Sequence, residues 1–168
     1  MDSNEWLYVN DYDNTVRYIL GYKGQNTLCC IGINPSTAEP NNLDRTLQSV
    51  ERIAMSNGYD SFIMFNVYPV RDTIFEKLPK EENEQLRKRN IEEIIKVINS
   101  LPKPVNIWLA YGDLIDKRDY TRSCFNQIKS ELDKNEVNYW HCGITKSGNP
   151  KHPLYKKSNT KLILYDEI

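Results

Sequence analysis

The stretch Leu28–Ile33, which reads Leu-Cys-Cys-Ile-Gly-Ile, breaks off at Asn34-Pro35. A continuous apolar run of this kind is typical of a strand that is buried on both faces of a parallel sheet. The loop that starts at Asn34 is therefore expected at the carboxyl end of a central strand. Open α/β sheets bind their ligands in the crevice beyond these strand ends.

Similar runs occur later in the sequence. Ser61–Asn66 and Val105–Tyr111 are apolar, end next to polar or glycine residues, and predict two more buried strands. Val137–Cys142 and Leu162–Tyr165 predict shorter strands. Thr15–Tyr22 mixes β-branched and aromatic residues, and we expect it to be a partly exposed edge strand or hairpin arm.

Segments of helical periodicity separate the strands. Asp44 is expected to cap a helix that runs to Asn57, and Glu81–Ser100 and Tyr120–Leu132 predict two further helices. This alternation predicts an α/β fold, namely a three-layer α/β/α sandwich with a mostly parallel central sheet and right-handed crossovers. No repeat or Gly/Ser linker interrupts the sequence, so residues 1–168 are expected to form a single α/β domain.

The composition restricts the possible partners. The 168 residues are 39% hydrophobic and 27% charged, with a formal net charge of −1. Proteins that coat nucleic acid without sequence preference neutralise many phosphates, and this charge balance argues against such a role. Because no run is long enough to span a membrane and no signal segment is seen at the start, we expect a cytoplasmic protein without membrane contact. The oligomeric state stays open.

The cysteines and histidines give no metal or redox signature. Cys29, Cys30, Cys124 and Cys142 have no C-x-x-C spacing, and reduced structural thiols are expected. Dinucleotide, P-loop, zincin and hydrolase-elbow motifs are absent from the sequence. We therefore expect neither a metal nor a cofactor.

A basic stretch lies near the end of the sequence. Val137–Tyr165 has no acidic residue but contains five lysines and both histidines, among them Lys146 and Lys151. This stretch could face a phosphate, or it could be a lysine-rich loop that is simply solvated.

Polar residues collect at three expected strand ends, namely Asn34–Thr37, Asn66–Asp72 and Tyr111–Asp113. Each cluster alone is compatible with turn chemistry, but three at one edge of a sheet favour a pocket. An Asn side chain offers one donor and one acceptor, which suits the edge of a pyrimidine base. In this interpretation Asn34 and Asn66 read a base, Tyr68 stacks on it, and Arg71 clamps a phosphate or carboxylate.

Two further residues are candidates for catalysis. Asp44 could orient a water molecule or stabilise a developing cation, and His152 could donate a proton to a leaving group because imidazole titrates near neutral pH. The alternative interpretation keeps Asp44 as a helix cap and His152 as an exposed loop residue.

The order of these residues resembles the bacterial and phage domain-of-unknown-function 1643 family. The resemblance covers roughly residues 15–156 and rests on two specific segments, Asn34–Ala38 and Gly143–Tyr155, the second of which contains Gly-Asn-Pro-Lys-His-Pro-Leu-Tyr. It supports the same candidate site without supplying a reaction. Asn34, Asp44 and His152 are the catalytic candidates. The substrate-binding candidates are Pro35, Ser36, Thr37, Thr46, Asn66, Tyr68, Arg71, Asn90, Lys146, Lys151 and Tyr155.

In layout the chain also resembles the uracil-DNA glycosylase-like superfamily, through Gly32–Pro35, Asn66 and the His152-Pro153 loop. This resemblance implies that Asn34 or a neighbour positions a hydrolytic water, that Asn66 reads the base edge, and that the His152 loop steadies the charge of the leaving base. No aspartate directly follows Asn34, and Leu154-Tyr155 and lysines replace the loop that presses into duplex DNA. Duplex DNA is thus a doubtful ligand, and a nucleotide, a nucleoside or a single flipped base is at least as plausible.

The leading hypothesis is an enzyme that hydrolyses an N-glycosidic bond in a nucleobase-containing substrate. The alternative is a non-catalytic sensor that binds a nucleotide or modified base in the same pocket. A third possibility is an interaction protein that uses the charged helix Glu81–Ser100, although charged helix faces are usually only solvated.

Overall fold

The computed structural model describes residues 5–72 and 74–166. Three α-helices and seven strands are found within these residues, together with the short 3-10 helices η1 (Phe75–Lys77) and η2 (Asp113–Asp116). The α-helices are α1 (Arg45–Ser56), α2 (Glu84–Ser100) and α3 (Thr121–Leu132). The strands are β1 (Trp6–Asn10), β2 (Arg17–Tyr22), β3 (Thr27–Gly32), β4 (Ser61–Asn66), β5 (Val105–Leu109), β6 (Val137–His141) and β7 (Ile163–Leu164).

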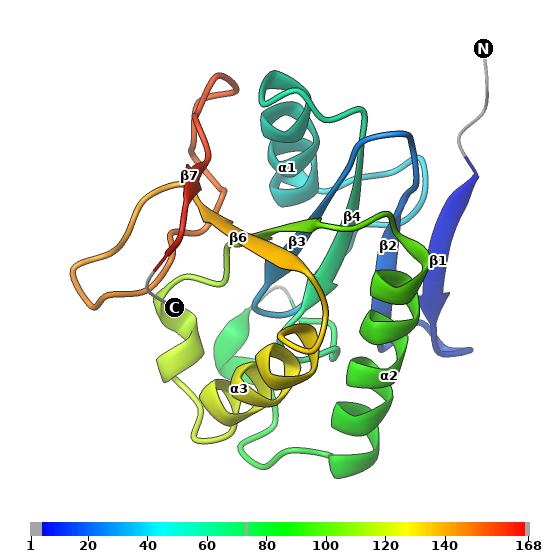
Figure 1. The fold of residues 1–168 in the computed structure, drawn as a ribbon. Coiled ribbons are helices and arrows are strands. Elements are labelled where there is room, and N and C mark those ends of the chain that lie inside the picture. The colour runs from blue at the N-terminus through cyan, green and yellow to red at the C-terminus, as the bar shows by residue number, and fades with distance from the viewer. Residues whose placement is uncertain (1–4, 73, 167–168) are drawn as a thin grey trace.

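The strands form one mixed sheet in the order β1-β2-β4-β3-β5-β6-β7 (Figure 1). The central strands β4, β3, β5 and β6 pair in parallel, as predicted. The outer pairs β1–β2, β2–β4 and β6–β7 are antiparallel, so the expectation of a mostly parallel sheet holds only for the centre. β1 and β2 are consecutive strands, and no described helix lies between β6 and β7, so these two pairs can be antiparallel. β2 and β4 are separated by β3 and α1.

Of the two alternatives predicted for Thr15–Tyr22, the hairpin arm is confirmed, because β1 and β2 are consecutive antiparallel strands, whereas the partly exposed edge strand was wrong. Every residue of β2 is buried, because β1 covers its outer side and pairs with it from Trp6 opposite Tyr22 to Asn10 opposite Arg17. No strand was expected before Thr15, and the residues of β1 are all only partly buried.

Side chains alternate between two cores on opposite faces of the sheet. Cys29 and Ile31 of β3 belong to the core under α2 and α3, whereas Leu28 and Cys30 belong to the core under α1. Figure 1 shows α2 and α3 together on one side of the sheet and α1 on the other. Alternation with a period of two places apolar residues on both faces, which confirms the three layers and explains why the central strands are uniformly apolar.

The helix boundaries follow from their caps. Asp44 is the N-cap of α1, since its Oδ1 accepts a hydrogen bond from the Leu47 backbone N–H at 3.0 Å, as predicted. The second helix begins three residues later than expected, at Glu84, because the side chain of Asn83 accepts hydrogen bonds from the N–H groups of Gln85 and Leu86.

The chain leaves β3 for β4 on one side and later returns to β5 on the other side of β3. The connecting helices α1 and α2 lie on opposite faces of the sheet. The carboxyl ends of β3 and β5 are thus neighbours whose following loops diverge. In α/β sheets this switch point opens a crevice for ligands.

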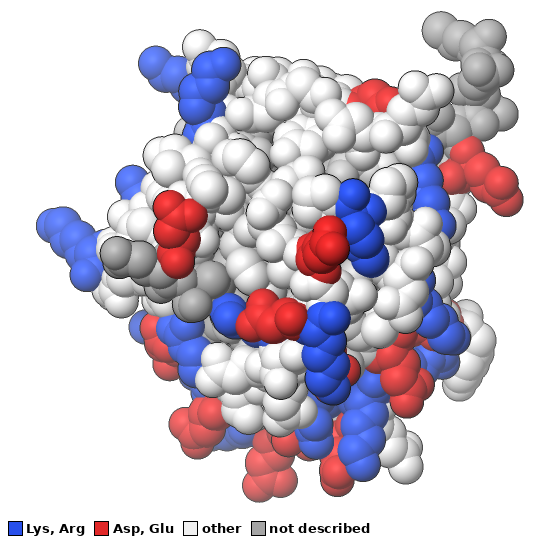
Figure 2. Space-filling view, in the orientation of Figure 1, with Lys and Arg blue, Asp and Glu red and all other residues white. Residues whose placement is uncertain are grey.

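The surface over α2 and α3 carries both signs of charge. Figure 2 shows interleaved basic and acidic side chains on this part of the molecule, and several form ion pairs within α2, such as Lys88 with Glu84 at 2.9 Å. Exposed pairs of this kind contribute little to stability and leave no field of a single sign. No helix in the described part of the chain has the length and apolarity to cross a membrane.

A substitution at Gly21 tests the contact between β2 and β4. A Cβ atom at this position would lie 2.3 Å from the backbone oxygen of Phe62 and 2.5 Å from the Cα of Ile63. We expect Gly21→Ala to lower the free energy of unfolding by about 1–3 kcal/mol or more, because backbone atoms cannot move aside without breaking the sheet. Met55→Ala, on an exposed helix position, is the control. Equal urea midpoints for the two variants would contradict this account.

Candidate functional site

A cleft of about 430 Å³ opens at the carboxyl end of β3. Its lining comes from the start of β2, the loops after β3 and β4, the first turn of α1, η2 and the loop around His152. The residues are Arg17, Ile33, Asn34, Pro35, Ser36, Thr37, Asp44, Arg45, Thr46, Asp72, Leu114, His152 and Leu154.

The cleft contains all three catalytic candidates, Asn34, Asp44 and His152. It also contains four of the predicted substrate-binding residues, namely Pro35, Ser36, Thr37 and Thr46. The sheet brings His152 to residues more than a hundred positions earlier in the sequence, because the loop around it lies against the carboxyl end of β5. At that end, a Cβ atom on Gly112 would be 3.4 Å from the Cβ of His152.

Asn34 holds the rim of the cleft together. Its Nδ2 donates to the backbone oxygens of Pro35, Val70 and Asp72 at 3.1–3.2 Å, which ties the loop after β3 to the loop after β4. Among the described residues nothing donates to its Oδ1, so this oxygen is available to a ligand or a water molecule in the cleft.

Asp44 combines a structural contact with a free oxygen. Its Oδ1 caps α1, as described above, while no hydrogen bond to Oδ2 is found in residues 5–72 and 74–166. The helix-cap interpretation of Asp44 is therefore correct, and the carboxylate nevertheless faces the cleft.

His152 is held as a neutral hydrogen-bond donor. Its Nδ1 accepts the backbone N–H of Leu154 at 3.1 Å, which leaves the proton of the neutral ring on Nε2. Burial lowers the pKa of His152 below its ordinary value, and the nearby charge of Asp44 opposes this shift. The side chain is partly buried, so it is not the exposed loop residue of the alternative interpretation.

Arg17 lines the cleft and was missed in the sequence analysis. The residue is only 1% exposed, its Nη1 donates to the backbone oxygen of Ala38 at 3.3 Å, and its buried Nε has no hydrogen-bond partner. Burial, followed by the charge of Arg71, lowers the pKa of Arg17 to about 10, which still leaves it charged at neutral pH. The available signal was an arginine next to the apolar residues of a predicted strand.

Arg71 lies beside the cleft rather than in it. It lines an adjoining hollow, and its guanidinium donates to the oxygens of Tyr8, Asn14, Ser36 and Ala38. With these bonds it braces β1 and the loop after β3. The predicted role as a free phosphate clamp does not fit this arrangement.

Three other predicted binding residues are buried inside the fold. Tyr68 is 1% exposed, packs against Tyr120 and accepts the Asn83 backbone N–H with its hydroxyl, so no ring face is free to stack on a base. Asn66 is also 1% exposed, and Asn90 donates to its backbone oxygen at 2.9 Å. These buried side chains support the loop after β4 from the interior of the fold.

The basic loop near the end of the chain does not contribute its lysines to the cleft. Lys146 is exposed, the side chain of Lys151 lies over Gly143, and Tyr155 is 89% exposed. The loop is held instead by Asn149 and Thr145, both of which donate to Asp113 of η2. This anchor was not evident from the sequence.

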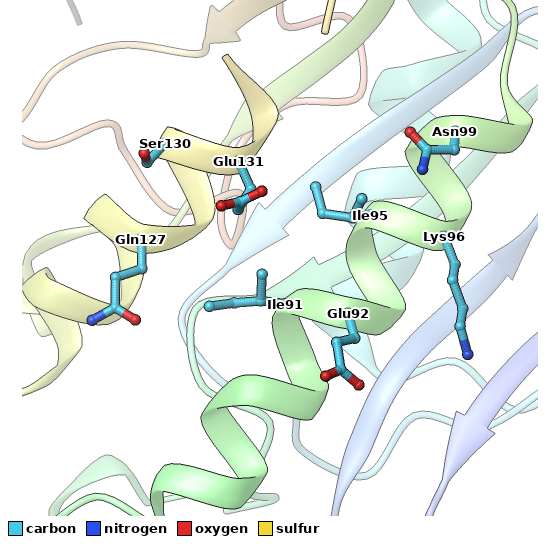
Figure 3. A pocket seen from close by; sticks show the side chains of 8 residues that line it. All are labelled: Ile91, Glu92, Ile95, Lys96, Asn99, Gln127, Ser130 and Glu131. Atoms are coloured by element: carbon cyan, nitrogen blue, oxygen red, sulfur yellow. The ribbon is translucent and has the colours of Figure 1, made fainter. Parts of the chain in front are cut away.

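A second hollow of about 620 Å³ lies between α2 and α3 (Figure 3). Ile91 and Ile95 face the gap between the helices, whereas Lys96 points away from it. The hollow is larger than the cleft at β3, but it lies away from the strand ends. It has no histidine, arginine or buried polar group in its lining, so it offers little for catalysis.

All four cysteines are buried free thiols, in agreement with the predicted structural role. No cluster of histidine, cysteine, aspartate or glutamate suited to a metal ion is found in residues 5–72 and 74–166.

The state of His152 can be measured by NMR. We expect its titration midpoint below about 6.5 and its neutral form protonated on Nε2. Asp44→Asn should lower the midpoint further, because it removes the charge that favours the imidazolium. Asp119→Asn, an exposed aspartate outside the cleft, should leave it unchanged. A raised midpoint in the wild type, or protonation of Nδ1, would refute this geometry.

Comparisons with known proteins identify the family. A family model described as "Protein of unknown function (DUF1643)" matches residues 17–154. Searches of curated proteins and of solved structures found no match. Because the matched range covers most of the 168 residues, the chain belongs to the DUF1643 family.

Proposed function

We propose that this protein hydrolyses the N-glycosidic bond of a small nucleobase-containing substrate in the cleft at the end of β3. The observation that carries the proposal is the presence of Asn34, Asp44 and His152 in one lining. An amide oxygen, a carboxylate and a neutral imidazole N–H are the groups this reaction needs.

The chemistry assigns each group a role. As the C–N bond breaks, its electron pair leaves with the base and positive charge develops on the sugar, and the Asp44 carboxylate stabilises this charge. A water molecule held by Asn34 Oδ1 and Asp44 Oδ2 attacks the anomeric carbon and gives its proton to the carboxylate. The Nε2–H of His152 donates a hydrogen bond to the departing base.

The position of the cleft supports a glycosylase-like arrangement of the fold. It lies at the switch point between β3 and β5, where α/β sheets bind ligands. The net charge of −1 and the mixed charges of the surface in Figure 2 favour a nucleotide, a nucleoside or a single flipped base over duplex DNA.

A non-catalytic sensor is the second candidate. It is favoured by the structural bonds of Asn34 and Asp44, each of which has a reason to be present without catalysis. In that case the cleft binds the same class of ligand and leaves it intact.

Base release from a panel of nucleosides, nucleotides and single-stranded oligonucleotides tests the proposal. Asp44→Asn is the informative variant, because asparagine caps a helix as well as aspartate but carries no charge. We expect it to fold normally and to lose roughly a hundredfold or more in turnover. Asp119→Asn should retain full activity.

The outcomes separate the candidates. Base release that Asp44→Asn abolishes supports the hydrolase. Equal release by Asp44→Asn and Asp119→Asn excludes the catalytic role of Asp44. Binding without release would identify a sensor. If no member of the panel binds or reacts, the nucleobase proposal is wrong.

A further inference from the structure

We propose that Arg17 forms an oxyanion subsite in the cleft that takes the terminal phosphate of the substrate, so that the ligand is a nucleoside monophosphate. This inference rests on the proposed function for the nucleobase and adds the phosphate. It starts from a charged group that the fold buries without a counter-ion.

A buried guanidinium normally requires an anionic partner. The free energy of removing a charge from water is recovered only when the charge is paired and its donors are used. Arg17 is 1% exposed, yet within residues 5–72 and 74–166 its guanidinium forms a single hydrogen bond, from Nη1 to the Ala38 oxygen, and its Nε is unpaired. No ion pair of Arg17 is found among the described residues.

A second cation adds to the positive charge that has no anionic partner. Arg71 donates to the same Ala38 oxygen at 3.3 Å, so two guanidinium groups share one neutral acceptor. Arg71 has no carboxylate partner in the described residues either, since its bonds go to hydroxyl, amide and backbone oxygens.

The carboxylates of the cleft form no direct ion pair with Arg17 among the described residues, although the charge of Asp44 acts to raise the pKa of Arg17 against the effect of burial. Asp44 and Asp72 both line the cleft, but neither forms a salt bridge with it, and one oxygen of each is engaged by a backbone N–H, from Leu47 and Ile74 respectively. The positive charge near Ala38 therefore remains available to a ligand.

The first turn of α1 supplies further donors at the same cleft. Its third and fourth N–H groups, of Leu47 and Gln48, are bonded to Asp44, whereas the N–H groups of Arg45 and Thr46 have no acceptor among the residues that the structure describes. Free N–H groups at a helix start, together with the helix dipole, favour an anion. The hydroxyl of Thr37 lies in the same lining.

A phosphate monoester fits these groups better than the alternatives. It carries a charge of about −1.5 to −2 at neutral pH, while a carboxylate or an internal phosphodiester carries only about −1, so it interacts more strongly with the buried guanidinium of Arg17 and the start of α1. The cleft volume of about 430 Å³ is within the range of small-molecule sites.

Binding measurements on the intact protein test this assignment. Calorimetry would compare a nucleoside 5′-monophosphate, the matching nucleoside and inorganic phosphate at constant ionic strength. We expect the monophosphate to bind roughly ten- to a hundredfold more tightly than the nucleoside, the range for hydrogen bonds to a charged group. Inorganic phosphate alone should bind measurably and compete with the nucleotide.

Arg17→Met is the decisive variant, because methionine retains an apolar side chain of adequate length without the charge. It should remove the preference for the monophosphate, while its melting temperature without ligand stays equal to or above that of the wild type, since an uncompensated buried charge is gone. Arg52→Met, on the exposed side of α1, is the control. A purely structural arginine would instead give a destabilised variant that keeps the preference.

If Arg17→Met does not fold, the wild-type comparison still decides, because equal affinities for monophosphate and nucleoside overturn the subsite. Failure of the proposed hydrolysis has a different signature. A monophosphate that binds through Arg17 without base release supports the subsite and refutes the reaction. Equal base release from the nucleoside and from its monophosphate supports the reaction and refutes the subsite.

Discussion

The structure depends on the parallel pairing of β3 with neighbours on both sides. From Leu28 to Ile31 this strand is bonded to β4 and to β5, and its alternating side chains enter both cores. A strand in this position can end only in a loop that emerges between two diverging connections. The location of the cleft is therefore a consequence of strand order rather than of any residue in its lining.

The loops around the cleft are fixed by polar side chains that bond to backbone groups. Asn34 joins the loops after β3 and β4, Arg71 joins the loop after β3 to β1, and Asn149 fastens the late loop to η2. A cleft with fixed walls can hold its chemical groups in place before a ligand arrives.

Arg17 links the fold to the chemistry of the cleft. As part of β2 it is rigidly positioned, and as a buried cation without a carboxylate partner it is unfavourable in the unliganded protein. His152 belongs to the same lining and complements Arg17, since one residue is suited to an anion and the other to a hydrogen bond with a leaving group.

The sequence by itself determined the central strands, the three helices, the cap at Asp44 and the loop segments around Asn34 and His152, because apolar runs, helical periodicity and capping residues act locally. Strand order, the burial of β2 under β1 and the roles of Arg17, Tyr68 and Arg71 were decided only by the tertiary structure. An arginine at the start of a strand reads the same in a sequence whether it faces solvent, a carboxylate or a cleft. The difference lies in its long-range neighbours, which depend on how the whole chain packs.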